Sequence, residues 1–336
     1  MKQNNEKRLI FDLHCDTIWK ISEAQRRGES IFLKKSNLQV DEEKLIKGNY
    51  FAQCFAVYIP NEYPDPYARC LHDIDIYDRQ IKQSRVLAPV YDFADFQKNE
   101  KNGKISAILT MEDGCPIGED FDKLYTLHRK GVRMICLLHN LVNPIGNPNF
   151  GGYFADGSPD RSVANTATGL TDFGRALVQE MNKLGIVIDV SHLSDKGFYE
   201  VVQLSKKPIM ASHSNARTVC CDIRNLTDDM LIKLAENGGV AGINYANHFM
   251  GNDAEHGRNT VKCALLHMRH IKKKIGVDHI ALGSDFDGIN PDIEISDASK
   301  TGRLIVALEK EGFSTDEIEK ITYRNALRVF KANMLS

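Results

Sequence analysis

The sequence Phe11-Asp12-Leu13-His14-Cys15-Asp16 places an imidazole and a carboxylate two residues apart at the end of a short apolar run. Alternate side chains of a strand point to the same side, so His14 and Asp16 are expected to share one face while Cys15 points away. Such a pair at a strand end can bind a metal ion. Taken alone it also fits a solvated turn, so the assignment depends on further ligands along the chain.

Short apolar runs recur along the chain, with helix-like segments between them. Several runs are continuous rather than alternating, as expected for parallel strands that helices cover. Eight such strands predict a closed (β/α)₈ barrel of the TIM type, with an open doubly wound sheet of fewer strands as the alternative. The predicted strands are 9–13, 51–59, 105–111, 133–138, 186–190, 208–211, 240–244 and 280–283.

Capping signals mark several of the helices between these strands. Gly185 ends one apolar-periodic segment, and Ser314 with Glu317 forms a capping box that opens another. Residues 140–170 show little periodicity, and because a long loop in a compact domain is usually functional, we expect this one to surround the active-site mouth. The whole chain, 1–336, is expected to be one barrel domain. The predicted helices are 41–48, 171–184, 227–236 and 314–330.

Composition excludes several classes of function. The 336 residues are 42% hydrophobic and 26% charged with a formal net charge of -2, so neither nucleic acid nor a membrane surface is indicated as a partner. The first apolar run is too short for a signal peptide or a membrane span, which favours a cytoplasmic location. The eight cysteines contain no Cys-x-x-Cys and are expected to be reduced, with two thiols rather than a vicinal disulfide at Cys220 and Cys221.

Acidic, amide and imidazole side chains stand at or just after the ends of seven predicted strands, and only the second strand offers none. In a barrel these positions converge on one mouth. Each has an ordinary explanation when taken singly, such as a buried histidine, a helix cap or a charged turn, but their recurrence favours a shared site. The residues are His14, Asp16, Glu112, His139, His192, His213, Asn244 and Asp285.

Three histidines and two carboxylates, with no cysteine in a ligand spacing, fit Zn²⁺, and Mn²⁺, Co²⁺ or Fe²⁺ are alternatives. Five ligands are too many for one open catalytic zinc and suit two ions that share a carboxylate. Carboxylates often orient ligating histidines, and Asp189 and Asp287 are expected to have such a supporting role.

Taken in order, motifs along most of the chain resemble the renal (membrane) dipeptidase family of zinc peptidases. The matching segments are Asp12-Leu13-His14-Cys15-Asp16, Met111-Glu112-Asp113-Gly114, 131–139, 169–174, Ile188-Asp189-Val190-Ser191-His192, Ser212-His213-Ser214-Asn215-Ala216, Arg224-Asn225, 283–288 and 325–330.

The resemblance implies a (β/α)₈ barrel with two zinc ions per chain that hydrolyses dipeptides. His14, Asp16 and Glu112 would hold one ion, and Glu112 with His192 and His213 the other. By the same resemblance His139, Arg224 and Asp285 would bind the substrate, and a homodimer is reasonable. The secretion and lipid-anchor signals of mammalian members are absent, so membrane attachment is not carried over.

These residues suggest a mechanism in which a hydroxide that bridges the ions attacks the scissile carbonyl. His139 would stabilise the tetrahedral intermediate, Asp285 would transfer the proton to the leaving amine, and Arg224 would bind a free C-terminal carboxylate. Alternatives are another barrel metallohydrolase, acting on a cyclic amide, lactone or phosphoester, or a metal-binding relative without catalysis. Cys15, Asp113 and Cys115 depart from the family pattern, and the departures bear on substrate preference.

Overall fold

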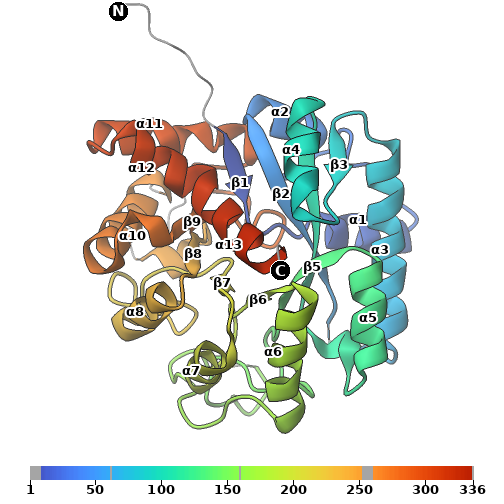
Figure 1. Cartoon of the computed structure of the whole chain (residues 1–336), viewed down its shortest axis with the longest axis vertical. Coiled ribbons are helices and arrows are strands. Elements are labelled where there is room, and N and C mark those ends of the chain that lie inside the picture. The colour runs from blue at the N-terminus through green and yellow to red at the C-terminus, as the bar shows by residue number, and fades with distance from the viewer. Residues whose placement is uncertain (1–8, 61–62, 159, 252–259, 335–336) are drawn as a thin grey trace, which may run out of the picture.

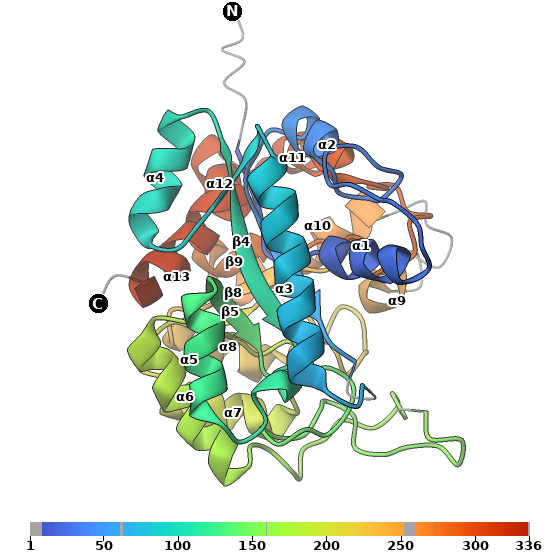
Figure 2. The ribbon, with the colours of Figure 1, turned by 90° about the vertical axis from the view of Figure 1, so that its right-hand side faces the viewer.

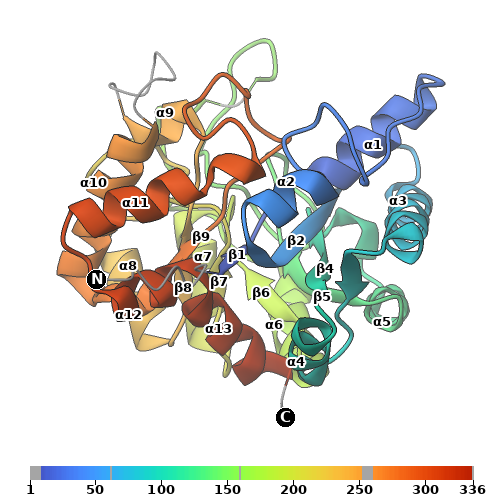
Figure 3. The same cartoon turned by 90° about the horizontal axis from the view of Figure 1, so that it is seen from above.

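The computed structural model describes residues 9–60, 63–158, 160–251 and 260–334. Nine parallel strands form one sheet at the centre of the molecule, and helices surround it (Figures 1 and 3). The strands are β1 (Ile10–Asp12), β2 (Tyr50–Tyr58), β3 (Leu87–Pro89), β4 (Ile105–Glu112), β5 (Val132–Cys136), β6 (Val187–Asp189), β7 (Met210–Ala211), β8 (Val240–Ile243) and β9 (Ile280–Leu282).

Eight of these strands close into a barrel. β2 pairs with β1 and with β4, β1 pairs with β9, and the remaining strands pair in sequence order. β3 lies outside this ring. It pairs with residues 105–107 at the beginning of β4, and β5 pairs with the same strand from Leu109 onward. All eight predicted strands are present, which confirms the (β/α)₈ fold, whereas β3 was not predicted.

Helices follow the strands around the outside of the barrel. The π-helical turn Lys320–Arg324 connects two of them. The helices are α1 (Thr17–Arg26), α2 (Glu42–Lys47), α3 (Pro66–Gln83), α4 (Phe93–Lys101), α5 (Phe121–Arg129), α6 (Asp172–Leu184), α7 (Asp195–Leu204), α8 (Asp228–Glu236), α9 (Asn247–Met250), α10 (Thr260–Ile275), α11 (Gly302–Lys310), α12 (Thr315–Glu319) and α13 (Asn325–Met334), and single 3₁₀ turns lie at Cys115–Ile117, Val277–His279 and Ala298–Lys300. No helix within the described ranges is long and apolar enough to cross a bilayer.

The predicted caps are present. Gly185 ends α6 in the left-handed conformation, with φ of 74°, and Ser314 with Glu317 forms the capping box of α12. The prediction of one continuous helix over 314–330 is wrong in detail, because the π-helical turn separates α12 from α13 and α13 continues to Met334. The other predicted helices correspond to α2, α6 and α8.

Two layers of apolar side chains form the core. One lies between the barrel and the surrounding helices, and the other fills the barrel interior together with α13. Phe330 of α13 stacks on Phe11 of β1, with 5.4 Å between ring centroids, and Phe96 of α4 contacts both rings. α13 therefore closes the end of the barrel at which the strands begin.

The opposite end of the barrel carries the long segment between β5 and α6. In Figure 2 the arrow of β4 points toward the side from which this segment, drawn in light green, extends. Backbone bridges join Gly146 to Leu170 and Phe150 to Ala164, so the segment folds back on itself. It thus lies at the end where the strands terminate.

Candidate active site

The residues expected to form the site stand where the strands end. Glu112 is the last residue of β4, and His192 and His213 follow β6 and β7 within three residues. His14 and Asp285 follow β1 and β9, which are neighbours in the barrel. Because all strands are parallel, these side chains meet at one rim.

Three of the residues at this rim, and also Asp287 shortly after Asp285, have a left-handed backbone conformation. The φ angle is 67° at His192, 64° at Asp285, and 71° at Asp113, directly after Glu112. Residues with a Cβ seldom adopt this region, at a cost of about 1–3 kcal/mol each. The sharp turns at the strand ends concentrate backbone strain where the predicted ligands lie, as is common at functional sites.

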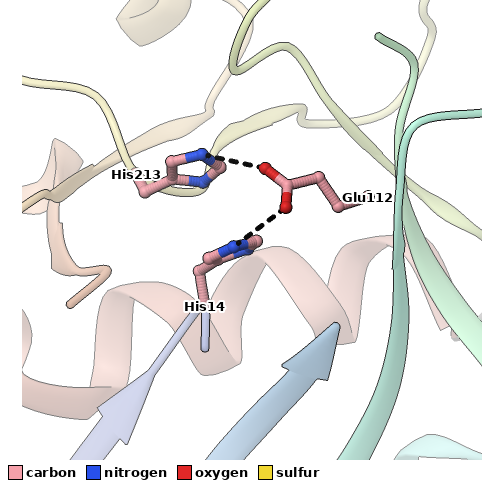
Figure 4. A group of neighbouring side chains, drawn as sticks. All are labelled: His14, Glu112 and His213. Carbon is pink, nitrogen blue, oxygen red and sulfur yellow. Dashed lines mark ion pairs between the residues drawn. The ribbon is translucent and has the colours of Figure 1, made fainter. Parts of the chain in front are cut away.

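Glu112 lies at the centre of the cluster, and its two carboxylate oxygens face different histidines (Figure 4). Oε2 is 3.6 Å from Nε2 of His14, whereas Oε1 is 3.5 Å from Nε2 of His213. Nε2 of His192 lies 3.2 Å from the same Oε1 atom. A carboxylate placed in this way can bridge two cations, one at each oxygen.

Two more carboxylates lie beside His14. Oδ2 of Asp16 is 3.6 Å from Nε2 of His14, and Oδ1 of Asp285 is 3.9 Å from the same nitrogen. The structure thus brings the five predicted ligands together and adds His139 and Asp285 to the cluster. The sets of three with ligand atoms within 4.8 Å of one another are His14, Glu112 and His213; Glu112, His139 and His192; and His14, Asp16 and Asp285.

Several atoms of the cluster have capacity for a cation. Nε2 of His14 and Oδ1 of Asp16 are buried without a hydrogen-bond partner. Nε2 of His192 and Nε2 of His213 face each other at 3.0 Å. Buried polar atoms are almost always paired, so unpaired donor atoms around one point fit a bound ion. Imidazole and carboxylate donors without thiolate suit Zn²⁺ or a similar divalent ion.

The buried carboxylates favour positive charge within the cluster. Burial opposes charge on His14, but Glu112 and Asp16 raise its pKa well above the usual range. Burial likewise opposes charge on Glu112, but the charge of His14 lowers its pKa well below the usual range. Burial and the charge of Glu112 raise the pKa of Asp16 to about 7. A cation bound here would compensate the same negative charge.

Hydrogen bonds behind the histidines set the orientation of two rings. The hydroxyl of Ser212 donates to Asp189 and lies 2.7 Å from Nδ1 of His213, so this Nδ1 carries the proton that Ser212 accepts. Nδ1 of His192 donates to Oδ1 of Asn140 at 3.2 Å. Both arrangements leave the Nε2 lone pair directed toward Glu112, as metal ligation requires.

A cleft of about 570 Å³ opens over the cluster, within the range of small-molecule sites. Its wall includes aromatic side chains and two arginines. Besides Asp16, Glu112, His192 and Asp285, it is lined by Trp19, Tyr58, Pro60, His139, Asn140, Arg161, Arg224, Ala246, His248, Phe249, Gly288, Ile289 and Asn290.

Arg224 places a buried guanidinium in this wall, and among the described residues no carboxylate lies within 4 Å of it. It donates two hydrogen bonds of 3.3 Å, to Oγ of Ser214 and to the carbonyl of His213, while its Nε has no partner. Burial lowers its pKa. A buried cation with unused donors is suited to bind a carboxylate.

His139 and Asp285 line the cleft, and contacts with neighbouring residues hold both side chains in place. The His139 ring lies between Tyr58 and His192, at centroid distances of 4.6 and 4.4 Å. Burial lowers the pKa of His139 to about 4, so its imidazole is neutral at pH 7. Nδ2 of Asn244 donates to Oδ2 of Asp285 at 2.9 Å and holds this carboxylate in place.

Some residues of the cleft were missed by the sequence analysis. The second strand does contribute, because Tyr58, the last residue of β2, lines the cleft. The strand-end rule that found the other residues of the cleft would have found Tyr58 if aromatic residues had been considered. Arg161 and Phe249 carry no such signal, because they come from a long loop and from the four-residue helix α9.

The residues that depart from the family pattern lie behind the cleft. Asp113 accepts hydrogen bonds from the backbone N–H groups of Cys115 and His139 and from Asn143, and thereby braces the long segment. Cys15 is buried and its thiol donates to the carbonyl of Cys54. The eight cysteines all lie within the described ranges, and none of them forms a disulfide there. Asp287 accepts hydrogen bonds from Thr17 and from the backbone of Gln39.

Comparison with known proteins agrees with this geometry. The family described as membrane dipeptidase (peptidase family M19) matches residues 2–335. Dipeptidase tcpJ of Claviceps purpurea is 29% identical over 304 residues, which cover 87% of this chain and 68% of that protein.

Two solved structures share the fold along nearly their entire length. The crystal structure of dipeptidase AC, a metallopeptidase of family M19, has a TM-score of 0.87 and 28% identity and covers 98% of this chain and 100% of that chain. A metallopeptidase from Rhodobacter sphaeroides, liganded with a phosphinate mimic of the dipeptide L-Ala-D-Ala, has a TM-score of 0.86 and 26% identity. The match covers 97% of this chain and 99% of that chain.

Proposed function

This chain belongs to the membrane dipeptidase family, peptidase family M19, and from this premise we propose that it hydrolyses the peptide bond of dipeptides with two zinc ions bound around Glu112. It is a metallopeptidase with a (β/α)₈ fold. The observation that carries the proposal is the position of Glu112 at the floor of the cleft. One carboxylate oxygen faces His14, and the other faces His192 and His213.

In this proposal His14 and Asp16 would hold one ion, His192 and His213 would hold the other, and Glu112 would contribute to both. The unpaired Nε2 of His14 and the paired Nδ1 atoms of the other two histidines support this assignment. The nitrogen and oxygen donors favour zinc, and Mn²⁺, Co²⁺ or Fe²⁺ are the alternative ions.

When bound, the two ions would supply Lewis-acid chemistry: they would lower the pKa of a water to about 7 and polarise the scissile carbonyl. Asp285 takes the proton of the attacking water and gives it to the amine as the C–N bond breaks. The hydrogen bond from Asn244 keeps this carboxylate facing the reacting atoms. The neutral His139 donates a hydrogen bond to the oxyanion of the tetrahedral intermediate.

Arg224 selects the length of the substrate in this proposal. Its guanidinium binds the free carboxylate of the second residue with two hydrogen bonds, so that the scissile bond of a dipeptide reaches the ligands of the floor. A larger peptide would have to place its next residue where the buried Arg224 lies. The dipeptide mimic bound by the Rhodobacter sphaeroides relative supports a substrate of this size.

Metal content and turnover of L-Ala-L-Ala test the proposal together. We expect about two zinc ions per chain, loss of hydrolysis on dialysis against a chelator, and recovery when zinc is added. Glu112→Gln should keep the far-ultraviolet circular dichroism of the wild type but lose both ions. Glu180→Gln is the matched control, because Glu180 lies on α6, where its carboxylate contacts Tyr125 and Lys183 and not the cluster around Glu112. A firm value of one ion per chain would contradict the shared role of Glu112.

The rival functions are separated by the choice of substrate. Turnover of a cyclic amide, lactone or phosphoester in place of dipeptides would identify another type of barrel hydrolase, and metal binding without any hydrolysis would identify a binding protein. A cytoplasmic location and a homodimer stay predictions from the sequence and its family resemblance.

A further inference from the structure

A second arginine stands at the mouth of the cleft. Arg161 belongs to the long segment between β5 and α6, and its side chain is exposed to solvent while it lines the same cleft as Arg224. Within the described part of the chain, no carboxylate lies within ion-pair distance of Arg161. The catalytic scheme above uses Arg224 but gives Arg161 no role.

Both guanidinium groups pack on the ring of Phe249. The Cζ atom of Arg224 lies 5.3 Å from the ring centroid, and the Cζ atom of Arg161 lies 5.8 Å from it. Because both distances start at the same centroid, the two cations are at most about 11 Å apart. Cation–π contacts of this kind hold a guanidinium in place and leave its N–H edge available for an anion.

The spacing matches a residue with two carboxylates. A guanidinium and a carboxylate that form two parallel hydrogen bonds have their central carbons about 4 Å apart. The α-carboxylate and the side-chain carboxylate of aspartate or glutamate are themselves separated by a few ångströms. Such a residue can therefore reach both cations at once, whereas a neutral side chain leaves Arg161 without a partner.

We propose that Arg161 binds the side-chain carboxylate of the second residue, so that the preferred substrates are dipeptides with a C-terminal aspartate or glutamate. This inference rests on the proposed function, because it assumes that Arg224 binds the α-carboxylate. Of the other residues that line the cleft, Phe249 and Ile289 are apolar and Asn290 carries an amide, whereas the carboxylates of Asp16, Glu112 and Asp285 belong to the cluster on the floor. Burial, together with the charge of Arg161, lowers the pKa of His248, so this imidazole is neutral as well.

The test compares L-Ala-L-Glu with L-Ala-L-Gln, which differ in charge and hardly in shape. We expect the zinc-loaded enzyme to favour L-Ala-L-Glu in kcat/KM by about ten-fold at low ionic strength. The preference should shrink at 0.5 M salt, because the Arg161 guanidinium is exposed and therefore screened.

Variants of Arg161 make the test specific. Arg161→Gln should bring the ratio of the two kcat/KM values close to one, Arg161→Lys should keep part of it, and Arg161→Glu should favour L-Ala-L-Lys over L-Ala-L-Gln. Arg129→Gln removes an equivalent exposed charge on α5 and should keep the wild-type ratio.

A wild-type ratio near one, or a ratio that Arg161→Gln leaves unchanged, would overturn the role of Arg161 while the dipeptidase proposal stands. If the protein hydrolyses none of L-Ala-L-Glu, L-Ala-L-Gln and L-Ala-L-Ala, the proposed function is wrong, and this inference is wrong with it.

Discussion

Replacing Arg224 by methionine separates a binding role from a structural one. The substitution removes the buried guanidinium and keeps an unbranched side chain that can pack in the same wall. If Arg224 binds the substrate carboxylate, dipeptides with a free carboxylate should be hydrolysed poorly, and amidated dipeptides, which never form this ion pair, should be affected little.

The structure sets the size of the expected effect. Arg224 is 5% exposed, so a carboxylate bound to it is largely withdrawn from water. Two charge-assisted hydrogen bonds contribute about 1.5 kcal/mol each, or about 3 kcal/mol together, which corresponds to roughly 150-fold in kcat/KM. The bonds that Arg224 makes within the protein are long, at 3.3 Å, and compensate little of the cost of burying the charge. We therefore expect the free energy of unfolding to stay constant or to rise by about 1 kcal/mol.

The assay measures kcat/KM for L-Ala-L-Ala and for its C-terminal amide on zinc-loaded protein, alongside unfolding in urea. Arg224→Lys is the matched control, because it keeps the charge without the planar fork and should lose about ten-fold on the free dipeptide. Equal losses on both substrates, or a fall of more than about 2 kcal/mol in the free energy of unfolding, would show that Arg224 has a structural role and refute the reasoning.

Three further predictions concern the rim, the barrel and the response to acid. Asp285→Asn should lower kcat by about 10²–10⁴-fold, the loss expected when a general acid–base group is removed, and metal analysis should still find the wild-type content. Activity within a few-fold of the wild type would mean that another residue acts as the base. Gly283→Ala would place a Cβ 1.7 Å from the carbonyl oxygen of Ser212, so the variant should lose about 3 kcal/mol of stability in thermal unfolding, whereas Gly302→Ala, with nothing within 4 Å, should not. Burial lowers the pKa of His267 to about 4. As the pH falls from about 6.5 toward 4, His267 is therefore protonated in the unfolded chain but not in the folded protein, and the free energy of unfolding decreases. His267→Gln should flatten this dependence in urea titrations of both proteins, and parallel curves would contradict it.

The barrel could be predicted because buried parallel strands are continuous apolar runs, and such runs are visible without any knowledge of tertiary contacts. β3 could not be found in this way. It is three residues long, ends in Pro89, and leaves Ala88 half-buried, so neither its length nor its pattern stands out. Its pairing with β4 is a tertiary contact, and the local sequence pattern does not indicate it.

The candidate site shows the same division. The residues of the cluster could be predicted because each lies at or shortly after the end of a strand, and in a closed barrel the ends of parallel strands meet at one rim. Arg161 and Phe249 come together because a long loop and a short helix fold over the mouth, and their local sequence carries no period that indicates this meeting. Asn244 could be placed at a strand end from the sequence, but its hydrogen bond to Asp285 is a tertiary contact that the sequence does not indicate.

The barrel closes where β1, near the N-terminus, pairs with β9, near the C-terminus, and this seam has a consequence for the protein during translation. His14 and Asp285 lie on the two sides of this seam, and the strands pair through Asp12 and Leu282. A nascent chain that has left the ribosome only as far as β8 lacks Asp285, and its barrel is open beside β1. Peptide hydrolysis by this site is therefore expected to begin only after translation has passed β9, so a partly synthesised enzyme has no activity toward peptides in its surroundings.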